Sequence, residues 1–447
     1  MTTITVTTDC LLAGAPPALI TALKGLLTID NPQYTAAKRY GRWIGKTLKP
    51  KLYYFRETAA GLQFPRGFSN QAVLLCREQT GASPEIIDKR RLLPDTGLTF
   101  SGTLRPYQQT AVDLVAKRSF GVLEAGTGSG KTIMALALIA RRRQPALIIV
   151  HTKELLYQWQ DRIAEFLGCE AGLIGDGQNR IGAVTVAIVN SARKRTCELV
   201  PQFGHLIVDE CHRVPAALFT DVVSNFDCHF LLGLSATAFR NDDGLTKLIY
   251  IFMGDRIHKV DQDELKATGA IVRPRLIRKE TGFSYAYRGD YQALLKALTR
   301  HEGRNRMIVD DIHRAVEDSG TVLVVSDRIG HCALFDRLLK EQGVSVALLT
   351  GKTPPEQRTA IVEAVQNGGL QVLVATIQLI GEGFDCPGLS TLFLTTPITF
   401  EGRLLQVIGR IMRPGKDKEA RVYDYLDDSI SVLRRSAQAR MRALAGL

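Results

Sequence analysis

The chain has 447 residues, more than one hydrophobic core usually organises, so two or three domains are expected. Hydrophobic residues make up 45% and charged residues 23%, which excludes a largely disordered chain. The formal net charge of +12 favours a polyanionic partner, with phosphate backbones as the first candidate. The eight scattered cysteines, the lack of a signal-peptide pattern and the lack of an apolar run of about 18 residues predict a cytoplasmic protein without membrane contact.

Residues 1–95 are expected to form a small basic α+β domain that binds nucleic acid. They carry 13 Lys and Arg against 7 Asp and Glu. Basic and aromatic side chains are interleaved between residues 38 and 56, which suits a surface that pairs phosphates with cations and stacks rings against bases. Arg42 and Trp43 are the candidate contacts. In the alternative interpretation, three rings form the core of a β domain with a solvated basic face: Trp43, Tyr53 and Phe55.

From about Phe120 onward, short apolar runs alternate with helical-period stretches, as in a parallel sheet wrapped by helices. Two such blocks are present, which predicts α/β domains at 96–258 and 259–447. Strands are expected at 121–124, 146–150, 184–189, 206–208, 230–234, 321–325, 346–349, 371–375 and 392–394. Helices are expected at 131–143, 154–167, 330–341 and 356–366. The stretch 241–304 is more polar and less periodic, so we expect it to hold the hinge between the blocks.

A glycine-rich loop follows the first strand of the first block and opens an Ala-rich helix, which is the context of a phosphate-binding loop. Its backbone amides would close around the ATP phosphates, helped by the positive potential of the helix N-terminus. Lys131 would neutralise the terminal phosphates, and Thr132 would place its hydroxyl on Mg²⁺. The residues predicted to bind the nucleotide are Gly126, Thr127, Gly128, Ser129, Gly130, Lys131 and Thr132. Ala125 occupies the first position of the pattern, where many such loops have Gly.

A second apolar run, 205–208, ends in two carboxylates, Asp209 and Glu210. A carboxylate at the tip of a strand beside the phosphate-loop strand can hold Mg²⁺, and a second can polarise the attacking water. We therefore predict that Asp209 binds the metal and that Glu210 is catalytic.

The segment Asp209-Glu210-Cys211-His212 resembles the DExH box of superfamily 2 helicases, and further motifs follow in that family's order. The resemblance spans residues 104 to 413 and implies two tandem RecA-like domains. Residues 104–108 resemble the adenine-reading segment, residues 152–159 motif Ia, residues 235–237 motif III, residues 381–385 motif V and residues 406–413 motif VI. The nucleotide contacts implied are Arg105, Gln108, Gly383 and Asp385. Ser235 and Thr237 would couple the ATP site to the track.

Motif VI carries the arginines that phosphoryl transfer needs. Positive charge must cover the γ-phosphate as charge shifts in the transition state, and an Arg delivered from outside the phosphate-loop domain can supply it. Arg410 and Arg413 lie three residues apart on an expected helix and therefore share a face, which Gln406 can join. Hydrolysis would then depend on closure of the two domains around ATP. The alternative is a solvated helix stripe.

Short polar and basic side chains at loop ends are the candidate contacts to the nucleic-acid backbone. They are Thr152, Lys153, Asn190 and Arg193 in the first domain and Ser326, Arg328 and Thr376 in the second. Such residues also commonly cap helices. Arg240 and Asp242 resemble the Arg-Glu-Asp element of XPB-type repair helicases, although Asn241 stands where that family has Glu.

The form of motif V and the basic N-terminal region also resemble UvsW-type phage branch-migration helicases. These likenesses imply an ATP- and Mg²⁺-dependent DNA helicase or translocase that acts on duplex, forked or branched DNA, as a monomer or weak oligomer. An RNA helicase, a translocase subunit of a restriction or defence assembly that does not unwind, and a P-loop switch without a track are the alternatives. The last leaves Arg410, Arg413 and the second block unexplained.

Overall fold

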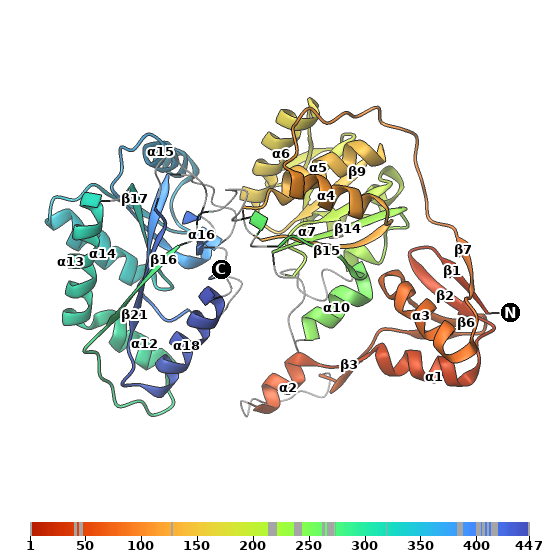
Figure 1. The fold of residues 1–447 in the computed structure, drawn as a ribbon, viewed down its shortest axis with the longest axis horizontal. Helices are drawn as coiled ribbons and strands as arrows, with labels where there is room; N and C mark the ends of the chain where they lie inside the picture. Colours follow the sequence, from red (N-terminus) through yellow and green to blue (C-terminus); the bar gives the residue numbers. More distant parts are fainter. Residues whose placement is uncertain are drawn as a thin grey trace. The chain divides into compact units, whose positions relative to one another are not determined.

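The computed structural model describes residues 2–39, 43, 48–126, 128–212, 221–236, 244–261, 264–265, 272, 274–318, 320–381, 388–398, 404, 407–408, 411–412 and 419–445. The chain divides into two compact units (Figure 1). The first contains residues 1–125 and 130–260, and the second contains residues 261–447 together with 126–129. No helix in the described part of the chain is long and apolar enough to cross a membrane.

The N-terminal residues form a mixed sheet of their own. Its strand order is β5 (Arg56–Thr58), β6 (Gly61–Pro65), β2 (Asp9–Ala13), β1 (Thr3–Val6) and β7 (Glu85–Asp88). Burial alternates along β1, β2 and β6, so one face of the sheet is buried. Helices α1 (Pro17–Leu26) and α3 (Ser69–Thr80) contact each other and contribute buried apolar side chains to the same core.

A separate two-stranded ribbon extends from this region. Strands β3 (Thr28–Asp30) and β4 (Lys51–Tyr53) pair antiparallel, and helix α2 (Pro32–Arg39) follows β3 directly. Ile29 is 4% exposed and faces the core, so its neighbours Thr28 and Asp30 face the other way. The ribbon therefore presents a polar outer face.

The central sheet of the first unit has eight strands among the described residues. Their order is β11 (Gln178–Arg180), β10 (Gly172–Gly175), β12 (Val184–Ile188), β9 (Ala146–Val150), β13 (His205–Val208), β14 (Phe230–Ser235), β8 (Phe120–Glu124) and β15 (Arg256–Lys259). Apart from the antiparallel β10–β11 pair, neighbouring strands are parallel. Parallel strands bring their carboxyl ends to one edge of the sheet, where ligands bind in such folds.

Helices connect these strands and begin and end at clear sequence signals. They are α4 (Pro106–Ala116), α5 (Lys131–Arg142), α6 (Lys153–Leu167), α7 (Val189–Lys194), α8 (Thr196–Leu199) and α10 (Gly244–Met253), with short 3₁₀ turns η1 (Arg66–Phe68) and η2 (Val200–Gln202). Thr152 caps α6 by accepting a hydrogen bond from the Leu155 amide, and α6 ends at Gly168, which has a φ of 62°.

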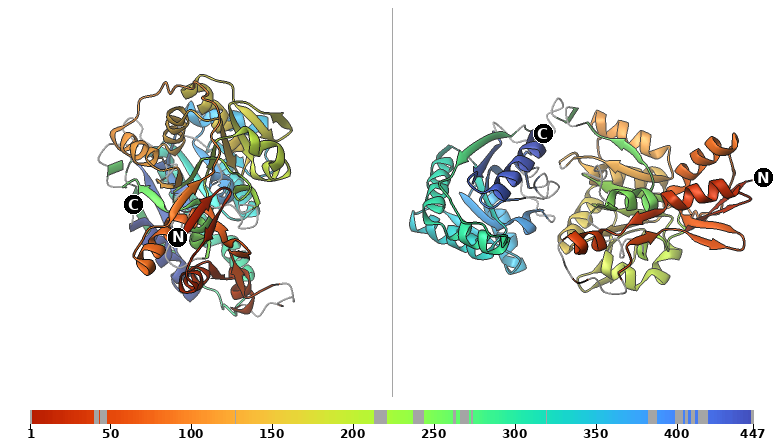
Figure 2. Two further views of the ribbon diagram at one scale, coloured as in Figure 1. Left: turned by 90° about the vertical axis from the view of Figure 1, so that its right-hand side faces the viewer. Right: turned by 90° about the horizontal axis from the view of Figure 1, so that it is seen from below.

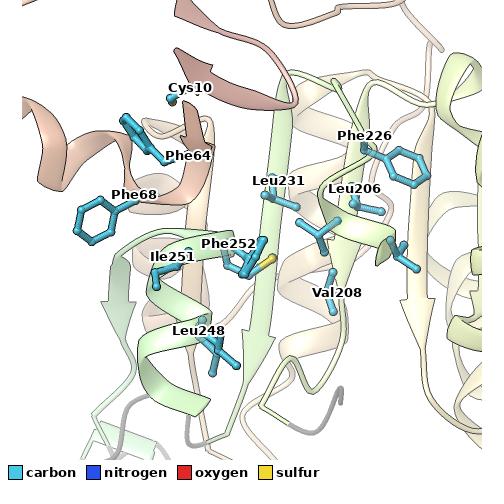
Figure 3. Close-up of a cluster of buried hydrophobic side chains, with 14 of the residues drawn as sticks. Cys10, Phe64, Phe68, Leu206, Val208, Phe226, Leu231, Leu248, Ile251 and Phe252 are labelled. Carbon is cyan, nitrogen blue, oxygen red and sulfur yellow. The ribbon is translucent and has the colours of Figure 1, made fainter. Parts of the chain in front are cut away.

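The N-terminal sheet and the central sheet of the first unit share one hydrophobic core. Figure 3 shows Phe68 beside Ile251 and Phe252 of α10, with Leu231 of β14 next to them. Gly67 lies directly against the α10 backbone, because a Cβ there would be 2.5 Å from the Phe252 carbonyl carbon. The N-terminal residues are therefore packed onto the ATP-binding sheet and are not a loosely tethered module.

Buried polar contacts also hold the N-terminal sheet in place. The Arg66 guanidinium, 2% exposed, donates a 2.6 Å hydrogen bond to the Cys228 carbonyl. Asn70 and Gln71 both donate to the carboxylate of Asp255, which precedes β15. These contacts join α3 to the edge of the central sheet.

The second unit is built on one parallel sheet. Its order, for the described strands, is β16 (Arg275–Glu280), β21 (Arg421–Leu426), β20 (Leu389–Leu394), β17 (Thr321–Ser326), β19 (Val372–Thr376) and β18 (Val346–Leu349). Its helices are α12 (Tyr291–Arg300), α13 (Glu302–Asp318), α14 (Ile329–Glu341), α15 (Pro355–Gln366), α16 (Ile377–Gly381) and α18 (Ser431–Ala445).

Helices cover both faces of this second sheet (Figures 1 and 2). Helices α13 and α14 pack with β17, β19 and β20 in one apolar cluster. Helices α12 and α18 form another cluster with Phe283 and Ile430. A parallel sheet buried on both faces explains why its central strands read as continuous apolar runs.

The expected strands and helices of both blocks are present, with ends shifted by at most three residues. The stretch 241–304 differs from expectation, because it contains α10, β15, β16 and α12 in addition to loops. Both β15 and β16 lie at sheet edges. An edge strand has one open side and tolerates charged residues, so it need not appear as an apolar run in the sequence.

Candidate ATP site and nucleic-acid contacts

The phosphate-binding loop lies between β8 and α5 at the carboxyl edge of the first sheet. Gly128 and Gly130 have φ values of 86° and 81°, which only glycine adopts without strain. The Ser129 amide donates to the Gly126 carbonyl and closes the turn. Helix α5 begins at Lys131, so the first amides of the helix point into the loop. This backbone is suited to hold an anion.

Gln108, the predicted adenine contact, lies directly against this loop. Its side chain is 5% exposed and accepts a 2.9 Å hydrogen bond from the amide of Arg105, which caps α4 and is itself exposed. A Cβ on Gly130 would be 2.4 Å from Gln108 Nε2. The segment expected to read the base and the loop expected to hold the phosphates are thus in contact.

Lys131 lies across the loop toward the acidic pair. Its ammonium group donates a 3.0 Å hydrogen bond to the Ala125 carbonyl and lies 3.7 Å from Glu210 Oε1. Thr132 follows it as the second residue of α5 and is half-buried. The structure therefore brings the loop lysine together with the DExH carboxylates.

The acidic pair lies at the tip of β13. The sequence pattern predicted this strand beside β8, but β14 separates the two. Asp209 is 6% exposed, and burial, followed by the nearby Glu210 charge, raises the pKa of Asp209 to about 6. Glu210 has a φ of 46°, a strained conformation for a residue with a side chain. A buried and a half-buried carboxylate so close together suit a divalent cation, which would offset their repulsion.

Trp159, on helix α6, contacts the predicted metal ligand Asp209. Its Nε1 donates a 2.9 Å hydrogen bond to Asp209 Oδ2, and the ring is 1% exposed. The sequence placed Trp159 in the segment that resembles motif Ia and gave it no contact with the metal site, because it shares an apolar stripe with Leu156 and Ile163. A core position is the ordinary meaning of that spacing.

The fourth residue of the DExH segment links it to motif III. His212 Nδ1 lies 2.7 Å from Ser235 Oγ and 3.3 Å from Glu210 Oε2. Ser235 is the last residue of β14 and is fully buried. The predicted coupling residue is therefore within hydrogen-bonding distance of a group that contacts the predicted catalytic carboxylate.

Candidate nucleic-acid contacts of the first unit lie at helix starts. Thr152 caps α6, and the half-buried Lys153 is the first residue of that helix. Asn190 and Arg193 lie exposed on α7, and Arg193 forms a 2.7 Å ion pair with Asp221. Their exposure and charge suit a phosphate backbone, while the Thr152 hydroxyl already has a structural role.

In the second unit, Ser326 and Thr376 are register partners at the carboxyl ends of β17 and β19. Ser326 is 1% exposed, and its Oγ lies 3.1 Å from His331 Nδ1 and accepts the Arg328 amide. The side chain of Arg328 donates to Gln292. This hydroxyl organises the start of α14, which is the capping role that residues of this kind often have.

Other predicted residues lie outside the described part of the chain. They are Arg42, Thr127, Thr237, Arg240, Asp242, Gly383, Asp385, Gln406, Arg410 and Arg413. Among the N-terminal aromatic residues, Trp43 is 89% exposed and Tyr53 is 60% exposed. Phe55 is partly buried against the core. The exposed rings of Trp43 and Tyr53 are not core residues. Of the three rings that the alternative interpretation placed in a core, only Phe55 packs against one.

Two family models match the chain. Residues 101–240 match the type III restriction enzyme res subunit, and residues 304–415 match the helicase conserved C-terminal domain. The putative helicase 161L of Invertebrate iridescent virus 6 is 30% identical over 77% of this chain and 81% of its own length. This chain belongs to helicase superfamily 2. Its members' two-domain α/β architecture and ATP-hydrolysing activity therefore apply to it.

Two further superfamily 2 relatives carry more specific names. The DNA 3'-5' translocase XPB2 of Sulfurisphaera tokodaii is 27% identical over 75% of this chain and 84% of its own length. The ATP-dependent DNA helicase uvsW of Enterobacteria phage T4 is 25% identical over 92% of this chain and 87% of its own length. The second match extends over most of the chain, including its N-terminal region.

Proposed function

We propose that this superfamily 2 enzyme is an ATP-dependent DNA helicase or translocase that acts on duplex or branched DNA. The observation that carries the proposal is the similarity to XPB2 and uvsW over more than four fifths of the length of each, since both are named for DNA. The basic N-terminal region, with 13 Lys and Arg against 7 Asp and Glu, supports a phosphate-rich track.

At the ATP site, the loop from Gly126 to Thr132 holds the nucleotide phosphates and Lys131 neutralises them. Thr132 and Asp209 would hold Mg²⁺, which when bound would supply positive charge against the phosphate oxygens. Glu210 orients the attacking water. Its neighbours Lys131 and His212 keep its carboxylate in place from two sides.

The second domain completes the reaction in this proposal. Arg410 and Arg413 stabilise charge on the γ-phosphate, with Gln406 on the same helix face, so hydrolysis waits for domain closure. Replacing Arg413 by Ala should preserve ATP binding and remove most turnover. Near-normal turnover would show that the arginine finger is another residue.

The path from the ATP site to the track runs through His212 and Ser235 in this proposal. His212 links Glu210 to Ser235 of motif III. Thr152, Lys153, Asn190 and Arg193 contact the backbone of one strand. Arg328 and Thr376 contact it from the second domain. Repeated closure and opening would then move the strand relative to the protein.

The test of the proposed function compares ATP turnover with duplex DNA, forked DNA, four-way junctions and RNA. We expect the strongest stimulation from branched DNA, together with ATP-dependent branch migration. A named RNA relative, the putative ATP-dependent RNA helicase L396 of a mimivirus, is 26% identical over 78% of this chain. If ATP turnover were strongest with RNA, RNA and not DNA would be the track. Stimulation without strand separation would favour the translocase of a restriction assembly.

A further inference from the structure

An open groove lies on the first unit, away from the ATP loop, where the N-terminal ribbon meets α10. It has a volume of about 500 Å³ and is lined by Lys24, Gly25, Thr28, Asp30, Lys51, Tyr53, Phe55 and Lys247. We call it the ribbon groove. Three of its lining side chains are lysines, two are aromatic and one is acidic, which is a composition suited to a phosphate next to a planar ring.

The strand register explains why these side chains share one surface. Thr28 pairs with Tyr53 and Asp30 pairs with Lys51, while the intervening Ile29 points into the core. The outer face of the ribbon thus forms the floor of the groove. Lys24, in the last turn of α1, and Lys247, on α10, contribute from its sides.

The charges of the groove differ in how far they are already paired. Lys24 forms an ion pair with Glu57 and lies 5.9 Å from the Phe55 ring centre. Lys51 and Lys247 are both exposed and form no ion pair with another described residue. These two ammonium groups remain available for an incoming phosphate.

The aromatic side of the groove offers a stacking surface. Tyr53 is 60% exposed and meets Phe55 edge to face, with ring centres 5.9 Å apart. A T-shaped pair joins the edge of one ring to the face of the other, so Phe55 leaves at least one face of the Tyr53 ring uncovered. Exposed Tyr side chains of this kind bind bases that are not paired, since a paired base presents no free face.

We propose that the ribbon groove binds one unpaired nucleotide of a nucleic-acid strand, with its phosphate between Lys51 and Lys247 and its base against Tyr53. The volume falls within the roughly 300–1,000 Å³ typical of small-ligand sites, which fits a single nucleotide. The proposal rests on the proposed nucleic-acid function and names the form of substrate that this surface recognises.

The segment that joins the two ribbon strands carries further exposed basic and aromatic side chains. Trp43, 89% exposed, and the exposed Lys38 and Lys49 lie in the segment that joins β3 to β4. Because α10 and the N-terminal sheet pack tightly around Gly67, the groove is fixed to the ATP-binding sheet. A strand held there moves with the ATP-binding domain, which makes the groove an anchor at a junction between paired and unpaired DNA.

The test uses the full-length protein and a short oligothymidine that carries one 2-aminopurine, whose fluorescence falls when the base stacks on a ring. We expect quenching with the wild-type protein. Tyr53→Ala should abolish the quenching and weaken binding about 5- to 100-fold, and Tyr53→Phe should preserve both. A Lys51→Ala/Lys247→Ala double variant should lower the slope of log affinity against log salt by about 0.7, the value for one single-strand phosphate.

Matched controls are Lys117→Ala and Tyr285→Ala, which change exposed residues far from the groove in sequence and should leave quenching and affinity unchanged. Suppose that Tyr53→Ala binds and quenches as well as the wild type, while DNA stimulates the ATP turnover of the wild type. This result would overturn the groove proposal and leave the proposed function standing. If Tyr53→Ala lost affinity equally for blunt duplex and for single strands, the site would not be specific for an unpaired nucleotide, and the proposal would be refuted. No stimulation of the wild-type enzyme by any nucleic acid would remove both proposals.

Discussion

Trp159 Nε1 donates a 2.9 Å hydrogen bond to Asp209 Oδ2, and both side chains are buried. Trp159 belongs to α6, whose first turn contains Thr152 and Lys153, while Asp209 is the proposed metal ligand. One helix therefore connects a proposed nucleic-acid contact to the proposed metal site. The bond also keeps one oxygen of the carboxylate in a fixed direction.

Replacing Trp159 by Phe should raise the Mg²⁺ concentration needed for half-maximal ATP turnover by roughly 10-fold, because outer partners of metal ligands typically contribute 10- to 100-fold. The substitution retains a ring in the core and removes only the N–H donor. A magnesium titration of turnover measures the effect.

The control for this variant is Tyr157→Phe on the same helix, which removes a hydroxyl that donates to Asp176 at the surface. It should leave the magnesium titration unchanged. If Trp159→Phe lowers the melting temperature and leaves the titration unaltered, Trp159 is a packing residue only.

Replacing Lys131 by Ala should lower the ATP turnover rate by at least about 100-fold, since a group that stabilises transition-state charge typically contributes 10²–10³. The fold should persist, because the ammonium group bonds to a loop carbonyl and packs against no core cluster. Turnover and circular dichroism are measured together. Retained turnover with an intact fold would place the phosphate contact elsewhere.

Replacing Gly67 by Ala should destabilise the first unit by about 1–3 kcal/mol, the usual cost of overpacking. The new Cβ would lie 2.7 Å from the Gly254 amide nitrogen and 2.7 Å from the Ile251 carbonyl oxygen, and neither backbone atom can rotate away. Thermal unfolding, with amide exchange of α10 as a local probe, measures the change.

Gly330→Ala is the matched control, since a Cβ there has nothing within 4 Å and the position lies in α14. It should leave stability unchanged or raise it slightly, because Ala favours helix over Gly. Normal protection of α10 in Gly67→Ala would mean that the N-terminal sheet is not locked onto this helix.

Acid should destabilise the second unit through His331. Its Nε2 lies 3.0 Å from Asn305 Oδ1, and the amide nitrogen of Asn305 donates to the Thr299 carbonyl, so His331 must donate at Nε2 and accept from Ser326 at Nδ1. Burial, and then the positive charge of Arg304, lower the pKa of His331 to about 3. The neutral ring is therefore part of the folded state.

The unfolded chain takes up this proton near pH 6.5 and the folded chain does not, so stability declines as the pH falls from about 6.5 toward 3. The decline is about 1.4 kcal/mol per pH unit in that window. Urea unfolding of the wild type and His331→Gln at pH 7, 6 and 5 tests it. The variant should be less stable at pH 7 but lose less stability on acidification. Parallel pH profiles would contradict the assignment.

Local sequence alone determined most regular elements of the two α/β blocks and the ATP loop. The runs at 146–150 and 346–349 are strands with the expected bounds. The first is fully buried, and a parallel strand buried on both faces must be apolar throughout. The loop around Gly128 and Gly130 was predictable because only glycine adopts its backbone, and Lys131 follows it at a fixed spacing. These features depend on neighbours within a few residues.

Tertiary structure alone decided which distant groups meet. The hydrogen bond of Trp159 to Asp209 joins residues 50 positions apart, and His212 meets Ser235 across 23 positions. The buried role of Ser326 and the packing of Gly67 on α10 are equally invisible in the chain order. The spacing of apolar residues along a helix or strand shows that a residue is buried, but it does not show what the residue faces. Strand order and helix packing decide the partner.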